Sequence, residues 1–168
     1  MKHSSILKRF SLLLLAMVLC LTCFGCSNDA DSDTDVDPSG VPALSAIYEE
    51  IQSSVTLPEL LELDSAEILT YLGIPADAYT EAVALIPTEA ILGDMLLLFH
   101  AAGVDTIDTI QEKLNAFREQ KLNEMNNYLP DEYAKINASS VTVRGAYLWL
   151  IVSSESTAIT DIIDQNIR

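Results

Sequence analysis

The stretch SVTVRGAYLWLIVS, residues 140–153, contains the pattern that decides the fold. Its first arm, residues 140–144, alternates polar and apolar side chains, as expected of a β-strand with one exposed face. Gly145 and Ala146 then give a two-residue hairpin turn. The second arm, residues 147–153, is apolar on both faces. We therefore predict that it is a central strand of an antiparallel sheet.

Helical patterns flank this hairpin on both sides. Residues 157–168 carry isoleucines at helical spacing and predict a C-terminal helix that packs on the sheet. Asp105 opens the clearest helix of the chain, because an apolar stripe at spacings of three and four follows it as far as Leu129. Pro130 is expected to end this long helix.

Two short helices are predicted near the start of the folded region. The first covers residues 44–51, where four large apolar side chains share one helical face. The second runs to Leu72, with Asp64 or Ser65 as its N-cap and Gly73 at its end.

Residues 79–102 fit two interpretations. Their Ala, Glu and Leu content favours a helix, but Pro87 and Gly93 interrupt the segment. Residues 92–99 are apolar on every side, which suits a buried strand as well as a buried helix.

The N-terminus has the pattern of an export signal. Three basic residues precede a short apolar run, residues 10–24, which ends at Gly25-Cys26. The run is shorter than the roughly 20 apolar residues that an uncleaved anchor needs. An ordinary secretory signal would have small residues three before the cut as well as directly before it, where this chain has Cys23 and Gly25. We predict a lipoprotein signal over residues 1–25, with Cys26 lipidated; Cys20 and Cys23 are weaker alternatives.

Charge and cysteine content narrow the function classes. After removal of residues 1–25, six basic residues face 25 acidic ones, a net charge of −19. Such a chain is repelled by phosphate backbones, so nucleic-acid binding is not expected. All three cysteines lie at or before Cys26, so the remaining domain has no disulfide and no thiolate ligand.

The exported chain divides into a tether and one domain. Residues 26–42 contain five aspartates and little to bury, which predicts a disordered acidic tether after the lipidated cysteine. The aspartates do not have the Gly and Glu positions of a calcium loop, so no metal site is predicted there. Residues 43–168 are enough for one globular domain.

Several short segments together resemble a family of lipoproteins from Gram-positive anaerobes whose mature part is one domain of unknown function. They are residues 57–59, 62–63, 86–87, 128–133 and 145–147, with Tyr79. The resemblance spans residues 43–168 and implies that residues 80–86 and 90–99 are strands. The fold expected is then α+β: about four antiparallel strands in two hairpins, helices on one side, and no activity carried over from the family.

No compact catalytic pattern is apparent in the mature chain. His100 is its single histidine, and Asp94, on the expected strand, would lie about 20 Å from it. Carboxylate pairs such as Glu49-Glu50, Glu59 with Glu62, and Asp131-Glu132 are expected by chance in so acidic a chain. We predict no catalytic, cofactor-binding or metal-binding residue, with Cys26 as the only modified site.

These observations favour a non-catalytic binding or accessory protein of the cell envelope. It would sit at the outer face of the cytoplasmic membrane through the lipid on Cys26. A protein partner with a basic surface fits the charge. The alternatives are a small envelope hydrolase and a solute-binding component of a transporter.

Overall fold

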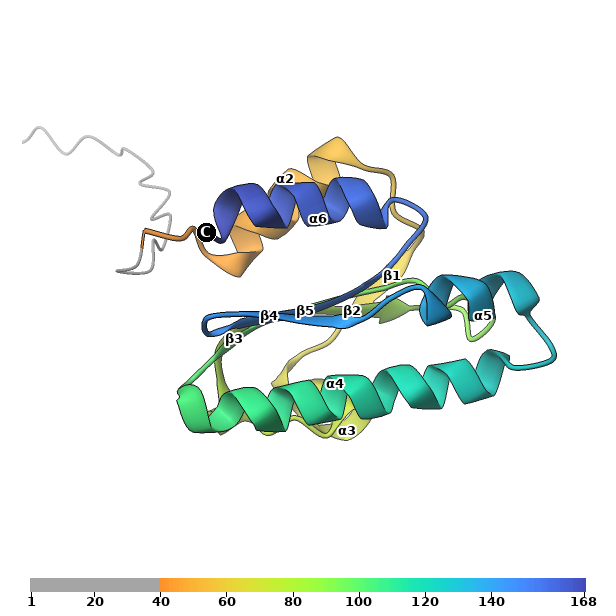
Figure 1. Ribbon diagram of the computed structural model, residues 1–168, viewed down its shortest axis with the longest axis horizontal. Coiled ribbons are helices and arrows are strands. Elements are labelled where there is room, and N and C mark those ends of the chain that lie inside the picture. Colours follow the sequence, from red (N-terminus) through yellow and green to blue (C-terminus); the bar gives the residue numbers. More distant parts are fainter. Residues whose placement is uncertain (1–39) are drawn as a thin grey trace, which may run out of the picture. The chain divides into compact units, whose positions relative to one another are not determined.

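A five-stranded antiparallel sheet forms the middle layer of the protein (Figure 1). The structure, a computed structural model, describes residues 40–168. The strand order is β1-β2-β3-β5-β4, so β3 and β5 are central and β1 and β4 are the two edges. The strands are β1 (Leu60–Glu62), β2 (Tyr79–Pro87), β3 (Met95–Ala101), β4 (Val141–Arg144) and β5 (Tyr147–Val152).

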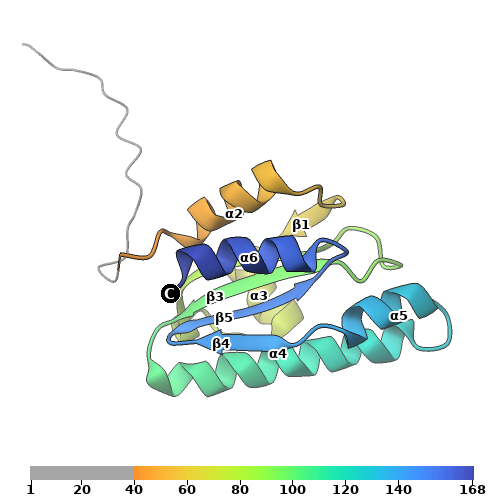
Figure 2. The same cartoon turned by 45° about the horizontal axis from the view of Figure 1, so that its top comes forward.

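Helices cover both faces of this sheet. Figures 1 and 2 show α2 (Leu44–Ser54) and α6 (Ser156–Asn166) on one face, and α3 (Ser65–Leu72) and α4 (Val104–Met125) on the other. The 3-10 turn η2 (Ala76–Ala78) leads into β2, and α5 (Pro130–Asn137) follows α4. The expectation of helices on one side is therefore wrong. None of the helices in residues 40–168 is long and apolar enough to cross a membrane.

The central strands are apolar on both faces, which explains why helices cover both faces of the sheet. In β3, Met95, Leu97 and Phe99 join a buried cluster under α3 and α4, hereafter the α3/α4 cluster. The intervening Leu96 and Leu98 join a second cluster with α2 and α6, hereafter the α2/α6 cluster. Successive strand side chains point to opposite faces, so two helical layers are needed to bury both sets.

The predicted hairpin and the second short helix are confirmed in detail. Arg144 pairs with Tyr147 across the β4–β5 turn, where Gly145 has a φ of +59°. The Asp64 side chain accepts hydrogen bonds from the main-chain N–H groups of Ala66 and Glu67, and Glu67 bonds back to the Asp64 N–H. This capping box stabilises the start of α3. Gly73 ends the helix in a left-handed conformation.

Residues 79–102 form two strands, but the second is shorter than expected. β2 matches the expectation, whereas β3 begins at Met95 because residues 88–94 form the connecting loop. The fifth strand, β1, was not expected, since Pro58 marked this region only as a helix break. It pairs with the end of β2 through Leu61 and Ile86.

The long helix is also shorter than predicted. α4 ends at Met125, and the φ of Asn127 is positive, at +69°. Pro130 does not end α4; it is the first residue of α5. Proline is well tolerated at this first helical position, because its missing N–H would have no helical partner there.

Candidate functional site

The residue predicted to be modified lies outside the described part of the chain. Cys26 belongs to residues 1–39, as do the signal segment and most of the predicted tether. Lipidation of Cys26 therefore stays a prediction from sequence.

His100 lies near the end of β3 in a stack of side chains. Its ring is parallel to that of Tyr147, with ring centres 4.3 Å apart. Its Nδ1 lies 3.1 Å from the Thr80 hydroxyl. The structure thus places His100 in a packed stack, while Asp94 belongs to a different group of residues.

The buried residue Asp94 forms an ion cluster with two partly exposed residues of α5. The Lys135 ammonium lies 2.7 Å from the Asp94 carboxylate and 3.0 Å from that of Glu132. Burial lowers the pKa of Lys135, but its hydrogen bonds to both carboxylates outweigh burial and raise that pKa overall. The ammonium therefore stays charged at neutral pH, and it donates hydrogen bonds to both carboxylates.

The same cluster fixes the loop before β3. The Gly93 N–H donates to Glu132 at 2.6 Å. A Cβ at position 93 would lie 2.9 Å from two side-chain carbons of Ile136 and 3.2 Å from the Glu132 carboxylate. A larger residue at position 93 would therefore force the Ile136 side chain to move. The sequence gives no signal for this cluster, because Glu132 and Lys135 show helical spacing but nothing links Lys135 to Asp94, 41 positions away.

The carboxylates considered from sequence have different surroundings in the structure. Glu50 accepts a hydrogen bond from Asn166 of α6, and Glu132 accepts one from Lys135 in the ion cluster. Glu59 and Glu62 lie at the exposed β1 edge. No group of three or more His, Cys, Asp or Glu residues within residues 40–168 has a metal-binding arrangement.

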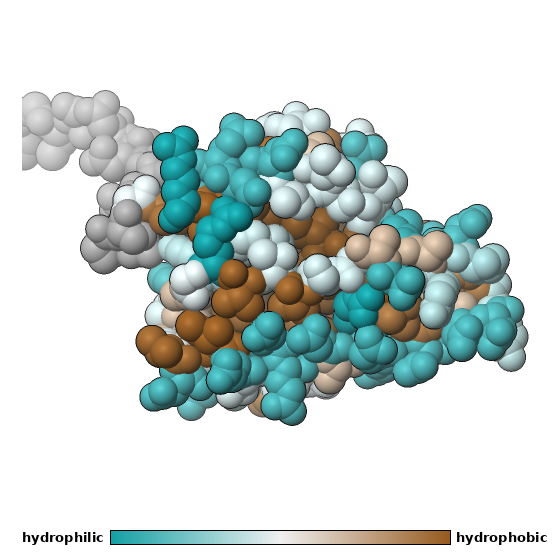
Figure 3. All heavy atoms as spheres, in the orientation of Figure 1, coloured by the Kyte–Doolittle hydropathy of each residue, from teal (hydrophilic) through white to brown (hydrophobic). Residues whose placement is uncertain are grey.

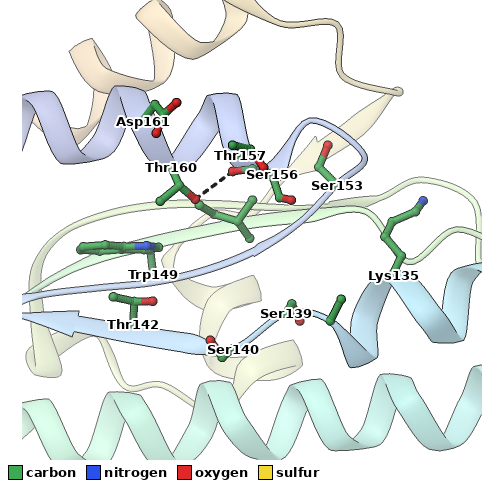
Figure 4. A pocket seen from close by; sticks show the side chains of 12 residues that line it. Lys135, Ser139, Ser140, Thr142, Trp149, Ser153, Ser156, Thr157, Thr160 and Asp161 are labelled. Atoms are coloured by element: carbon green, nitrogen blue, oxygen red, sulfur yellow. Dashed lines mark hydrogen bonds between the residues drawn. The ribbon is translucent and has the colours of Figure 1, made fainter.

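A hollow of about 380 Å³ lies between α6 and the β4 edge (Figure 4). Trp149 and Thr142, neighbours across the β4–β5 pair, line it together with Ile151. Thr160 of α6 faces them from the other side, with its hydroxyl bonded to the Ser156 carbonyl. Most of the lining is hydroxyl-bearing: Ser139, Ser140, Thr142, Ser153, Ser156, Thr157 and Thr160.

The cations beside this hollow already have anionic partners. Lys135 lies in its lining and is held by Asp94 and Glu132. Arg144 lies over the Trp149 ring, pairs with Asp164 at 2.9 Å and donates to the Ile167 carbonyl. The hollow therefore suits a small neutral polar molecule better than an anion.

A second hollow, of about 320 Å³, lies beside the β1 edge. Its lining includes Tyr48 and Gln52 of α2, the apolar side chains of Val55 and Leu57, and Leu60 of β1. Burial, and then the negative charge of Glu62, raise the pKa of Tyr48, while the hydrogen bond from Gln52 acts in the opposite direction. This hollow is thus partly apolar and has carboxylates beside it.

Charge is distributed unevenly between the two halves of the described chain. Residues 40–103 contain ten carboxylates and no Lys or Arg, whereas residues 104–168 contain ten carboxylates and all six Lys and Arg residues that follow Cys26. The acidic first half forms α2, β1, α3, β2 and β3. The two sheet edges therefore differ: β1 belongs to the purely acidic half, and β4 to the half with mixed charge.

Residues 53–153 match the model of a domain of unknown function, DUF4358. The chain belongs to this family. No curated protein and no solved structure that was compared matches the chain. The DUF4358 match contains all five strands and α3 to α5. It leaves out nearly all of α2 and the whole of α6, the two helices that bury the second face of the sheet.

Proposed function

We propose that this protein is a membrane-tethered, non-catalytic binding or accessory lipoprotein of the cell envelope. The lipid on Cys26 would hold it at the outer face of the cytoplasmic membrane, and the acidic tether would separate the domain from that surface. Its partner would be an envelope protein with a basic surface. The observation that carries this proposal is the acidic half of the domain, residues 40–103, which has no Lys or Arg.

Electrostatics explains why such an excess of carboxylates favours a basic partner. A surface of one charge sign speeds the encounter with a partner of opposite sign and disfavours partners of like charge. Salt screens these interactions over about 10 Å at 0.1 M ionic strength, so association should slow as salt rises. A partner held mainly by buried apolar contacts would respond much less.

Crosslinking of the full lipidated chain in intact cells tests the proposal directly. We expect a crosslinked partner whose recovery falls several-fold when the exposed Glu49 and Glu89 are both changed to Gln. The matched control changes Asp131→Asn and Glu155→Gln, two exposed carboxylates of the mixed half. Equal recovery from both pairs, or no specific crosslink at all, would contradict a basic partner on the acidic half.

A second candidate function, capture of a small polar solute, is favoured by the α6/β4 hollow. Its volume of about 380 Å³ lies within the range of about 300–1,000 Å³ found for ligand pockets. A screen of neutral polar metabolites by thermal shift tests it. A ligand whose stabilising effect is abolished by Thr142→Val would support solute capture; stabilisation unchanged by Thr142→Val would place the ligand elsewhere.

A further inference from the structure

The edge strand β1 offers unpaired main-chain groups. The Leu63 N–H donates to the Ala84 carbonyl at 2.8 Å, and the Thr88 N–H donates to the Glu59 carbonyl at 3.5 Å. Bonded pairs alternate along an antiparallel ladder. The N–H and C=O groups of Leu60 and Glu62, which lie between these bonded positions, therefore face away from β2 and toward the open edge of the sheet.

The side chains of β1 give this edge two distinct faces. Leu60 packs against the α2/α6 cluster, and Glu62, two residues later, lies on the same face. Leu61 points to the opposite face and is 43% exposed. An incoming strand would therefore meet a carboxylate on one face and an aliphatic side chain on the other.

The hollow beside β1 extends this surface toward α2. Val55, Leu57 and Leu60 contribute apolar lining, and Glu59 lies at the same hollow. Because Leu60 and Glu62 share a face, the side chain that a paired strand directs toward this hollow lies on the same face as the one opposite Glu62. The hollow can therefore receive a Lys, with the methylene groups beside Leu60 and the ammonium beside Glu59. The edge and the hollow together thus offer main-chain hydrogen bonds and a place for one Lys side chain.

Charge decides which occupant fits. Residues 59–67 carry four carboxylates, and no Lys or Arg occurs anywhere in residues 40–103. An acidic segment would be repelled, whereas Lys or Arg opposite Glu62 would be attracted. A second copy of this chain is also disfavoured, because its own first half carries the same charge.

The other edge strand, β4, has no comparable preference for a basic segment. Figure 3 shows apolar surface there, between α6 and α4, and Val143 is 37% exposed. The Arg118 side chain, however, already donates hydrogen bonds to the Asn137 and Ser139 carbonyls, just before β4 begins. Arg144 of β4 is itself paired with Asp164, so β4 presents no uncompensated charge of one sign.

We propose that β1 is a docking site for an extended basic segment of the partner protein, which adds to the sheet as a sixth strand beside β1. The inference rests on the proposed function and deepens it, because it assigns the partner a segment in which Lys or Arg alternates with aliphatic residues. Recognition of this kind takes affinity from main-chain hydrogen bonds and specificity from alternate side chains.

Synthetic peptides and the full chain in mild detergent test this docking. The probe is the capped peptide KVKVKVK; its controls are EVEVEVE and KVKPKVK, in which proline prevents continuous strand pairing. We expect KVKVKVK to bind at least tenfold more tightly than either control. At saturation, hydrogen exchange of the Leu60 and Glu62 amides should slow at least tenfold, because these are the groups that face outward.

Two matched substitutions locate the peptide. Leu61→Lys places a positive charge at the β1 edge, where it would repel the lysines of the peptide. This change should weaken KVKVKVK binding at least tenfold. Val143→Lys makes the same kind of change at the β4 edge, at a residue of similar exposure, and should leave binding within twofold. Equal effects of the two changes, equal binding of KVKPKVK, or protection at Val141 and Val143 in place of β1 would overturn the inference.

The two proposals can fail separately. If KVKVKVK does not bind, but crosslinking in cells captures a partner that depends on Glu49 and Glu89, the β1 inference falls and the proposed function stands. If no partner is captured and KVKVKVK does not bind, both fall.

Discussion

Lys135 connects two segments that are distant in sequence. Its ammonium links Asp94, the last residue of the loop before β3, to Glu132 on its own helix, α5. Asp94 is one of only two buried polar residues in the part of the chain that the structure describes. A buried carboxylate is costly unless it is paired, so the ion cluster is where a single side chain governs how α5 attaches to the sheet.

Lys135→Met should destabilise the domain by about 1–3 kcal/mol at pH 7, because Asp94 would stay buried without its cation. The raised pKa of Lys135 means that its contribution is fully present below the usual value of 10.5 and is lost as pH rises through the higher folded-state pKa. The stability gap between wild type and variant should therefore close in strong alkali.

Urea unfolding from pH 7 to 11 measures this gap. Lys113→Met is the control, since Lys113 forms no ion pair within residues 40–168. The absence of a gap at pH 7, or an equal loss in the control, would show that the ion cluster does not stabilise the fold.

Trp149 gives a second test at the level of one residue. It is 3% exposed, in the middle of β5, and belongs to the α2/α6 cluster. Trp149→Ala should cost roughly 3–5 kcal/mol in unfolding free energy. The fluorescence of this sole tryptophan should be blue-shifted in the folded protein; a maximum typical of water would contradict its burial.

At the level of elements, the sequence predicted most of the helices and strands that are specified by neighbouring residues. The β4–β5 hairpin, α2, α3 and α6 follow from turn residues, caps and helical spacing, and α4 differs only at its end. Two elements were not predicted. Helix α5 was missed because Pro130 was interpreted only as the end of the long helix. Strand β1 is three residues long and exists because β2 pairs with it. Likewise, Glu132 and Lys135 gain their role only when Asp94 is brought beside them.

Because α2 and α6 bury the second face of the sheet, a chain that lacks them should behave differently. The family match ends at Ser153, before α6, yet Ile159 and Ile163 of α6 are fully buried in the α2/α6 cluster. A chain cut to residues 53–153 would expose Trp149, Leu96 and Leu98 to water. We expect it to bind the dye ANS and to lose cooperative unfolding, whereas a chain of residues 40–168 should unfold in one transition. Cooperative unfolding of the trimmed chain would show that α2 and α6 are dispensable.

At the level of the whole molecule, the two ends of the described chain lie close together. Val41 and Ile167 are both in the α2/α6 cluster, and Figures 1 and 2 show the orange segment that begins the described chain near the C-terminus. The β1 edge begins at Leu60, after α2 has crossed the sheet from that end. The described chain therefore begins at the opposite end of α2 from the hollow beside β1.

The attachment itself can be tested at Cys26. Labelled fatty acid should enter the wild-type chain and be absent from Cys26→Ser, which should accumulate as the precursor, because Gly25-Cys26 has the small residue that a signal cut requires. Cys20→Ser and Cys23→Ser are matched controls, since Leu19 and Thr22 precede those cysteines, and both variants should still be labelled. Normal membrane-bound maturation of Cys26→Ser, or loss of label in Cys23→Ser alone, would move the lipid to another cysteine. A lipid is held in the membrane by apolar burial and not by charge. The protein labelled at Cys26 should therefore stay with membranes through a high-salt wash that would release a protein held there by charge alone.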